Sequence, residues 1–305
     1  GCTLLEKENP KKTGARKLVK CLVCGEIFDS SLEICPVCGV GKENFIPWDE
    51  EESSFSRDTN DFYVILGNGA AGLSAAKAIR ERDKTGSIVM ISNEPVSAYN
   101  RPMLTKALAA GLSAEQIAVE PASWYEENKI YQMLGRTVTS VDTEAKEVLL
   151  DDGSKCRYTK LIYALGSECF IPPIPGWDKP EVIAIRRLSD TEKIASLLPR
   201  TKEVVVIGGG VLGLEAAWEL KKSGCSVTVL ELAPQIMGRQ LDLPASQLLT
   251  EIARDCGIQI HTGVQIASIE GDTSVTGVKL ADGTCFPAQM VIVSAGVRAN
   301  TALAS

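Results

Sequence analysis

Four cysteines near the start of the chain have the residue type and the spacing of a metal site. Cys21 and Cys24 form one Cys-x-x-Cys pair, Cys35 and Cys38 form a second, and ten residues separate the pairs. Four thiolates at this spacing can surround one ion tetrahedrally, an arrangement that suits zinc or a single iron. We therefore expect a metal at these four cysteines, and the spacing alone leaves open which of the two ions it is.

Two glycine-rich turns further along the chain have the spacing G-x-G-x-x-G, which is typical of dinucleotide-binding sites. Each turn follows an apolar strand and opens a helix, the context that makes the motif specific. The first glycine permits the tight turn, the second lets the backbone approach a pyrophosphate, and the third lets helix and strand pack closely. The pyrophosphate then meets free N–H groups at the positive end of the helix dipole. The glycines are Gly67, Gly69 and Gly72 in the first turn and Gly208, Gly210 and Gly213 in the second.

An acidic residue ends the second strand of the second unit. The carboxylate of Glu231 can accept hydrogen bonds from ribose hydroxyls there and would repel a 2′-phosphate, which favours NADH over NADPH. The first unit has Ser92 at the matching place and Glu94 two residues further on. This different placement of the acid predicts that the two units bind two different dinucleotides.

The elements that must position these turns occur twice. One strand–turn–helix–strand segment begins at Phe62 and its second copy begins at Glu203. Each copy is followed by a hairpin signal with an Asp-Gly turn. An apolar run then ends in Ala-Leu-Gly at Gly166 in the first copy and in Ser-Ala-Gly at Gly296 in the second. A repeat of this length predicts one architecture used twice. We expect an α/β fold with duplicated Rossmann-like dinucleotide-binding domains behind a small metal module that holds its ion with four cysteines.

Composition limits the classes of partner. The net charge of −7 argues against nucleic acid, and no run of 18 apolar residues could span a membrane. Ten cysteines, six of them scattered singly, fit a reducing cytoplasm better than a secreted disulfide scaffold. We expect a cytoplasmic protein with no nucleic acid and no membrane as partner, and the sequence leaves its oligomeric state open.

Residues 62–305 resemble the FAD- and NAD(P)-dependent pyridine nucleotide oxidoreductases, in the branch of NADH:rubredoxin reductase, ferredoxin reductase and the nitrite reductase large subunit. The resemblance rests on GNGAAGLSAAKAIR, EPVSAYNRPMLTKAL, IYALGS with IPPIPG, VVVIGGGVLGLEAA, RQLD and AGVRANTALA. It implies FAD on the first unit and NAD(P)H on the second. The stretch CPVCGVGKENF resembles the second knuckle of rubredoxin, and the ten-residue loop between the pairs is nearer the rubredoxin-like domain of rubrerythrin.

The resemblance also implies roles for single residues. Glu94 would contact the FAD ribose, Arg101 the FAD phosphates and Lys106 the flavin, whereas Glu215 would lie near the nicotinamide. Lys106 and Glu215, the candidate catalytic residues, would pair across the interface of the two rings. A cation near the flavin stabilises its reduced, anionic form. Further cofactor-binding residues that the resemblance implies are Ala70, Ala71, Ala164, Gly166, Val211, Leu212, Ala295 and Gly296.

The group that accepts electrons from the flavin has to be inferred from what the sequence lacks. Disulfide-reducing members of the family keep a cysteine pair after the first strand–helix unit, but residues 95–111 contain no cysteine, and His261 is the only histidine. The resemblance therefore implies electron transfer from NADH through FAD to a rubredoxin-like iron centre. The acceptor would be a rubredoxin-type, oxygen- or peroxide-scavenging or nitrite-reducing protein. The alternative is a structural zinc ribbon that docks a partner protein while the flavin delivers electrons directly.

We expect six segments along the chain. They are a basic arm (1–20), the rubredoxin-like four-cysteine domain (21–46), an acidic linker (47–61), the first part of an FAD-binding domain (62–170), an NAD(P)H-binding domain (171–287) and a return to the FAD-binding domain (288–305). Related reductases continue past this point with a segment that closes over the flavin. We therefore expect the FAD-binding domain to be truncated in this sequence.

Overall fold

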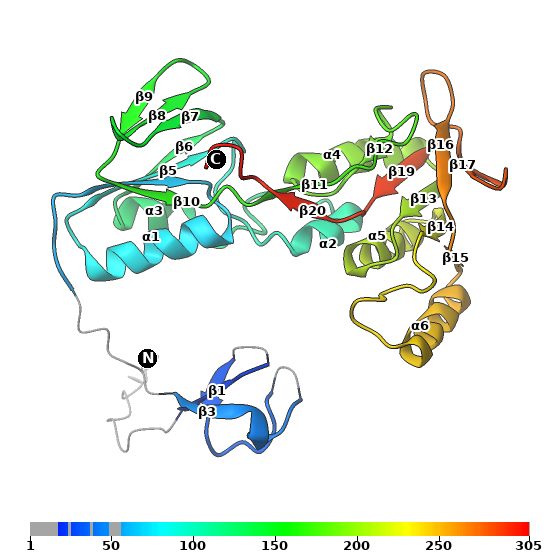
Figure 1. Cartoon of the computed structure of the whole chain (residues 1–305), viewed down its shortest axis with the longest axis horizontal. Coiled ribbons are helices and arrows are strands. Elements are labelled where there is room, and N and C mark those ends of the chain that lie inside the picture. The colour runs from blue at the N-terminus through cyan, green and yellow to red at the C-terminus, as the bar shows by residue number, and fades with distance from the viewer. Residues whose placement is uncertain (1–17, 24–25, 37–38, 49–55, 305) are drawn as a thin grey trace, which may run out of the picture. The chain divides into compact units, whose positions relative to one another are not determined.

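The chain folds into two compact units, Gly1–Arg57 and Asp58–Ser305, in the computed structural model (Figure 1). The structure describes residues 18–23, 26–36, 39–48 and 56–304. The division between the units falls inside the stretch expected to be a linker.

The first unit is a small antiparallel sheet with the order β2-β1-β3. Its elements are β1 (Leu18–Cys21), β2 (Ile27–Asp29), the 3₁₀ turn η1 (Lys42–Asn44) and β3 (Phe45–Trp48). Strand β1 begins three residues before the predicted start of the module at Cys21, because Leu18, Val19 and Lys20 pair with both neighbouring strands.

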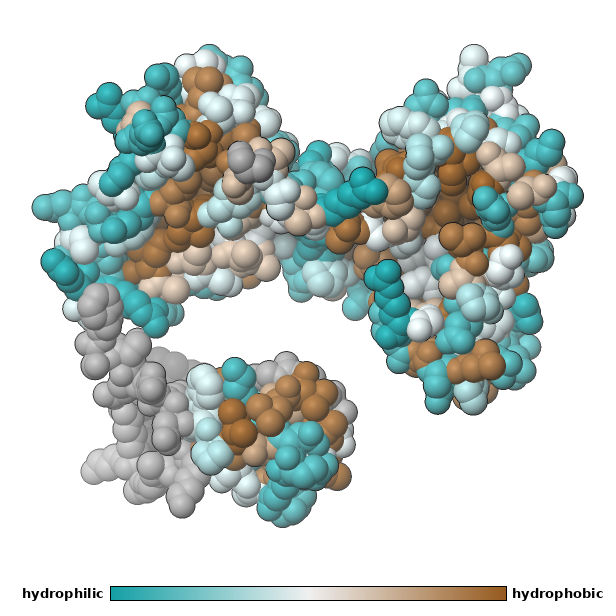
Figure 2. Space-filling model, in the orientation of Figure 1, coloured by the Kyte–Doolittle hydropathy of each residue, from teal (hydrophilic) through white to brown (hydrophobic). Residues whose placement is uncertain are grey.

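The core formed by the described residues of the first unit is very small. Cys21, Phe28 and Cys35 are its buried members, and the rings of Phe28 and Phe45 meet edge to face with their centroids 4.9 Å apart. Large apolar side chains remain at the surface of this unit (Figure 2), among them Leu22, Val23 and Ile34. So little buried apolar surface cannot stabilise a fold by itself, and a bound metal is the usual supplement in units of this size.

The second unit begins with a four-stranded parallel sheet of order β10-β4-β5-β6. A three-stranded antiparallel sheet, β7-β8-β9, is inserted before β10. The turn in its β8–β9 hairpin contains Gly153 at φ 80°, which confirms the first Asp-Gly hairpin. The elements are β4 (Phe62–Leu66), α1 (Ala70–Arg82), β5 (Ser87–Ser92), α2 (Met103–Ala110), α3 (Ala122–Glu127), β6 (Ile130–Leu134), β7 (Val138–Asp142), β8 (Glu147–Leu150), β9 (Lys155–Arg157) and β10 (Lys160–Tyr163).

The second half of this unit repeats the plan with a five-stranded parallel sheet of order β12-β19-β13-β14-β15 and the antiparallel sheet β16-β17-β18. The expected duplication is therefore confirmed. The elements are β12 (Val182–Ile183), α4 (Leu188–Leu197), η2 (Leu198–Arg200), β13 (Glu203–Ile207), α5 (Val211–Lys222), β14 (Ser226–Glu231), α6 (Leu243–Asp255), β15 (Ile258–Thr262), β16 (Ile266–Glu270), β17 (Gly277–Leu280), β18 (Cys285–Pro287) and β19 (Met290–Val293).

The end of the second half differs from the predicted boundary at residue 287. Strand β19 lies between β12 and β13, and all four of its residues, Met290–Val293, are buried there. This half therefore runs on to Val293, because a strand with four buried apolar residues completes the centre of its own sheet. The chain then returns toward the first half through β20 (Val297–Ala299), which pairs with β11 (Ser167–Cys169).

Helix α2 belongs to the first half in sequence but packs against α5 and α4 of the second half (Figure 1). Its Leu108 is buried in the main core of the second half together with Ala216, Ala217 and Leu220. The two halves are thus joined by this helix as well as by the β11–β20 ribbon. In the part of the chain that the structure describes, we find no helix with the length and apolar character needed to cross a membrane.

Candidate functional site

The two glycine turns have the same geometry. Gly67 and Gly208 have φ angles of 100° and 110°, a region that side-chain-bearing residues rarely adopt. A Cβ atom on Gly67 would lie 2.2 Å from the carbonyl oxygen of Ala164, and one on Gly208 would lie 2.3 Å from that of Ser294. Each turn is therefore pressed against the chain that leaves the neighbouring parallel strand.

The middle glycine of each turn faces open space. A Cβ atom on Gly69 or Gly210 would meet no atom of the described chain within 4 Å, although its neighbours in the motif are tightly packed. Both residues are N-caps, neither helix N-terminus receives a side-chain cap, and neither first turn holds an acid. Open space in front of free N–H groups fits a pyrophosphate, so both turns fit the dinucleotides predicted for them.

The first residues of the two helices lie next to the two open glycines, Gly69 and Gly210. Ala70 and Ala71 form the first turn of α1, and Val211 and Leu212 form that of α5, where both are about half exposed. The segments Ala164–Gly166 and Ser294–Gly296 also lie beside the turns, because the backbone of Ala164 contacts Gly67 and that of Ser294 contacts Gly208. Ala164 and Gly166 follow β10, whereas Ala295 and Gly296 follow β19. The third glycines, Gly72 and Gly213, pack against the first glycines of their own turns.

Glu231 lies at the end of β14 beside the second turn. Its carboxylate accepts hydrogen bonds from the backbone N–H groups of Gly209 and Ala233, the latter at 2.7 Å. These two bonds fix the carboxylate at the edge of the sheet where a dinucleotide ribose lies in Rossmann-type folds.

Glu94 and Arg101, for which the family resemblance implies contacts with the FAD ribose and phosphates, are joined to each other in this structure. Arg101 Nη2 lies 2.8 Å from Glu94 Oε1, and the hydroxyl of Tyr99 donates to Glu94 Oε2 at 2.6 Å. Burial raises the pKa of Tyr99 and the bond to Glu94 raises it further. Glu94, Tyr99 and Arg101 thus orient one another. A bound FAD would have to accept additional hydrogen bonds from this group or replace the Glu94–Arg101 ion pair.

Arg186 is a residue of the site that sequence reasoning missed. Its guanidinium donates to the backbone oxygen and to the hydroxyl of Ser167, both at 2.8 Å, and lies next to Gly166. The backbone oxygen of Arg186 accepts a hydrogen bond from Arg101. Since Arg101 and Arg186 are far apart in the sequence, only folding reveals that one network joins them.

Lys106 and Glu215 lie at the junction of α2 and α5, but the contact between the helices uses another residue. The hydroxyl of Thr105 donates to Glu215 Oε2 at 3.0 Å. Lys106 is exposed, and among the described residues no ion pair joins it to Glu215. The structure therefore brings the Glu215 carboxylate on α5 against α2 and shows Thr105 as its partner.

The cysteine site is described in part. Cys21 and Cys35, one from each Cys-x-x-Cys pair, are buried in the same cluster of the first unit. Cys24 and Cys38 lie outside the described residues. Two thiols from separate pairs that converge on one core fit the donor set of a tetrahedral metal.

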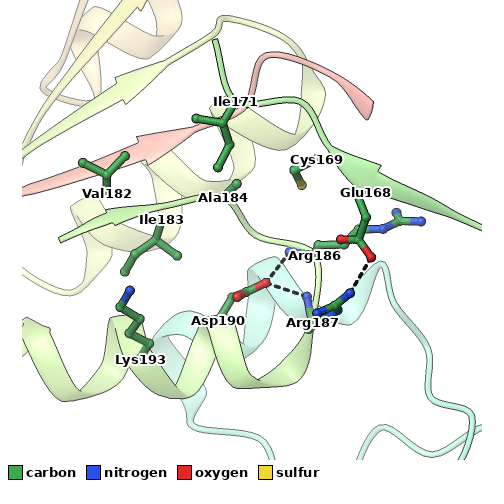
Figure 3. A pocket seen from close by; sticks show the side chains of 10 residues that line it. All are labelled: Glu168, Cys169, Ile171, Val182, Ile183, Ala184, Arg186, Arg187, Asp190 and Lys193. Carbon is green, nitrogen blue, oxygen red and sulfur yellow. Dashed lines mark hydrogen bonds and ion pairs between the residues drawn. The ribbon is translucent and has the colours of Figure 1, made fainter. Parts of the chain in front are cut away.

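A cavity of about 250 Å³ lies beside β11, between β12 and α4 (Figure 3). Arg187 and Glu168 form an ion pair at its wall, and Asp190 accepts hydrogen bonds from the backbone N–H groups of Arg186 and Arg187. Burial raises the pKa of the Cys169 thiol on another wall. None of the predicted cofactor residues that the structure describes lines this cavity, whereas Arg186 does. The cavity therefore contains no residue of either glycine turn but shares Arg186 with the network that reaches Arg101.

Comparison with known proteins decides the family. Residues 62–305 match the model of the family described as pyridine nucleotide-disulphide oxidoreductase. The chain belongs to this family. Residues 20–46 match a second description, the rubredoxin-like domain of rubrerythrin. Both resemblances predicted from the sequence motifs are thereby confirmed, together with the α/β fold.

Several individual members of the family are similar to this chain. A nitrite reductase [NAD(P)H] of Bacillus subtilis is 40% identical over 241 residues, which are 79% of this chain and 30% of that protein. A ferredoxin reductase from Rhodopseudomonas palustris superposes with a TM-score of 0.77 at 32% identity, over 80% of this chain and 61% of that one. The NADH:rubredoxin oxidoreductase of Clostridium acetobutylicum superposes with a TM-score of 0.65 at 29% identity, over 78% of this chain and 58% of that one. The chain thus spans less than two thirds of each relative.

Proposed function

We propose that this protein is an NADH-dependent, FAD-containing oxidoreductase that passes electrons to an iron centre in its own rubredoxin-like unit and from there to an acceptor protein. The observation that carries the proposal is the pair of open glycine turns, each in front of an uncapped helix, within one folded unit. Two such turns fit the two dinucleotides that hydride exchange between NADH and a flavin requires.

Each half contributes different groups to binding. The turn at Gly69 and the Glu94–Arg101 pair would hold the FAD phosphates and ribose, whereas the turn at Gly210 and the carboxylate of Glu231 would hold NADH. Glu231 supports the preference for NADH, because a carboxylate fixed at this edge repels a 2′-phosphate. When bound, FAD supplies the exchange between the two-electron chemistry of NADH and one-electron acceptors.

The remaining residues of the site orient the reactants. Lys106 at the exposed surface of α2 would lie near the flavin, and Glu215 on α5 near the nicotinamide. Hydride transfer needs no acid or base from the protein, only close approach and exclusion of water. The packing of α2 on α5 supports this arrangement, because it sets the distance between the two halves.

The absence of a redox cysteine pair, at the place where disulfide-reducing members of the family keep one, supports an iron centre as the group that takes electrons from the flavin. Residues 95–111 have no cysteine, although the family is named for disulphide oxidoreductases. A single iron held by four thiolates accepts one electron at a time, and zinc does not. Relatives named as ferredoxin and rubredoxin reductases support a small electron-carrier protein as the acceptor, and the nitrite reductases support a nitrite-reducing one.

The metal and its reduction give the first test. We expect anaerobically purified protein to contain about one iron for each set of four thiolates, with a visible band that NADH bleaches in the presence of FAD. The alternative function, a structural zinc ribbon that docks a partner protein, predicts stoichiometric zinc and no such band. Zinc in protein produced with iron in excess would decide for that alternative.

The electron path gives the second test. We expect Cys35→Ser, which removes a buried thiol of the cluster, to abolish reduction of a one-electron acceptor while NADH still reduces the flavin. Cys285→Ser is the matched control, because Cys285 is exposed in the second unit. Acceptor reduction that persists in metal-free Cys35→Ser protein would remove the first unit from the electron path.

A further inference from the structure

The contact between Thr105 and Glu215 joins an element of the FAD half to an element of the NAD half. Thr105 lies on α2, is only 3% exposed, and faces α5. Leu108, one turn further along the same helix, is buried in the core of the second half. The position of Thr105 relative to α5 is therefore held by the burial of Leu108 in that core.

The hydroxyl of Thr105 has one hydrogen and two acceptors within reach. Glu215 Oε2 lies 3.0 Å from Oγ1, and the backbone oxygen of Pro102 lies 3.4 Å away. The carboxylate is both the nearer acceptor and the charged one, and charge-assisted hydrogen bonds are the stronger kind. The hydrogen is consequently donated to Glu215.

Glu215 has little else to hold it. The residue is exposed on the surface of α5, on the same stripe as Val211, and within the described chain no cation pairs with its carboxylate. A glutamate side chain at a surface otherwise samples several rotamers, and restricting it costs conformational entropy. The hydroxyl of Thr105 removes much of that freedom before any ligand binds.

We propose that Thr105 is a positioning residue that holds the carboxylate of Glu215 at the nicotinamide end of the NADH site. The inference rests on the proposed function and adds a residue to it that the family motif does not single out. Thr105 belongs to the FAD half in sequence and packs on α5 of the NAD half, so its hydroxyl links Glu215 to an element of the FAD half.

The test is to measure the affinity of the purified full chain for two probes, NADH and ADP-ribose, by fluorescence or calorimetry. ADP-ribose carries the pyrophosphate and both riboses but no nicotinamide, so it does not reach Glu215. We expect Thr105→Val, which keeps the shape and removes the hydroxyl, to weaken NADH binding about three- to tenfold, the effect of one hydrogen bond. We expect the affinity for ADP-ribose to stay the same.

Three further variants separate positioning from stability. Thr191→Val is the matched control, because Thr191 is a buried helix threonine on α4 whose hydroxyl donates only to the backbone oxygen of Leu188. It should leave both affinities unchanged. Thr105→Ser keeps the hydroxyl and should restore NADH binding. In a Glu215→Ala background, Thr105→Val should have no further effect on NADH binding.

The outcomes distinguish the inference from the function on which it rests. If the wild-type chain binds NADH but Thr105→Val binds NADH equally well, or loses both probes in parallel, the positioning role is overturned and the proposed function stands. If the wild-type chain binds neither probe, the proposed function itself fails. Should Thr105→Val not fold, Thr105→Ala allows the same comparison, because it also removes the hydroxyl without adding volume.

Discussion

The carboxylate of Asp83 shows how single residues hold the site's framework. It is 3% exposed and accepts hydrogen bonds on both oxygens, from Thr59, Thr85 and Gly86 and from the hydroxyl of Tyr63. The acid therefore fastens the residues just before β4 to the C-terminal end of α1. This is the opposite end of the strand–helix pair from the first glycine turn.

We expect Asp83→Asn to lower the free energy of unfolding by about 1–3 kcal/mol at neutral pH, because its amide places a donor against donors. Burial by itself raises the pKa of Asp83, but the hydrogen bonds from Thr59, Gly86 and Thr85 outweigh it and hold that pKa well below its usual range. A depressed pKa contributes stability above the unfolded value of about 4, and that contribution is lost as the pH falls further.

Denaturant unfolding at neutral and acid pH checks this prediction. The difference between wild type and Asp83→Asn should be largest at neutral pH and shrink below pH of about 4. Asp58→Asn is the control, because Asp58 is exposed and accepts a single backbone bond from Lys84. A difference that persists unchanged in acid would show that the charge of Asp83 contributes nothing.

Residue-level prediction was possible where chemistry follows a local motif. The glycines and Glu231 stand at fixed offsets from a strand end, so their spacing predicts their place, whereas Arg101 was implied by the family resemblance. Thr105 and Arg186 carry no such signal, because each acts through a partner on a distant element. The family resemblance implied that Lys106 pairs with Glu215. Adjacent residues on a helix point in different directions, so Thr105 faces α5 while Lys106 is exposed.

At the level of elements, each turn–helix unit combines a packed glycine with an open one. Gly208 is held at φ 110° against Ser294, whereas Gly210 has an extended backbone with φ −84° and space around it. The two glycines therefore serve different purposes within one turn. The first is required by the fold of the turn, and the second is required by what approaches it.

We expect the two glycines to respond differently to a single added methyl group. Gly208→Ala should cost more than about 1 kcal/mol of stability, because the conformation is strained and the new atom collides with a carbonyl. Gly210→Ala should leave the melting temperature unchanged and abolish binding of NADH and ADP-ribose.

Thermal unfolding and probe binding, measured on both variants, check this prediction. Gly224→Ala is a further control for strain alone, since Gly224 has φ 91° and open space but lies at the far end of α5. It should lose stability and keep its affinity. Unchanged binding by Gly210→Ala would mean that no pyrophosphate approaches this turn.

At the level of the whole molecule, the chain consists of two units with separate cores. The first unit buries Cys21, Phe28 and Cys35, whereas the second contains the remaining hydrophobic clusters of the described residues. A core of this size would depend on a bound metal at the cysteines, because ligand binding supplies much of the folding free energy of small metal-bound units.

We expect metal removal by a strong chelator to unfold residues 18–48 while the second unit keeps its melting temperature. Hydrogen exchange resolved along the sequence measures this directly. Amides of β1 and β3 should lose protection, and those of β13 and β14 should not. Equal loss of protection in both units would show that their stability is coupled, and retained protection in the first unit would show that the metal is dispensable for its fold.

The sequence by itself determined the family, the duplicated α/β plan, the positions of both glycine turns and the four-cysteine pattern. These features are encoded locally, by spacing along one strand, turn or helix, and the repeat doubles the signal. The tertiary structure decided that β19 completes the second sheet, that Arg101 meets Arg186, and that Thr105 rather than Lys106 meets Glu215. Each of these contacts joins segments far apart in the chain, and only packing of α2 on α5 and closure of the sheets determine which side chains meet.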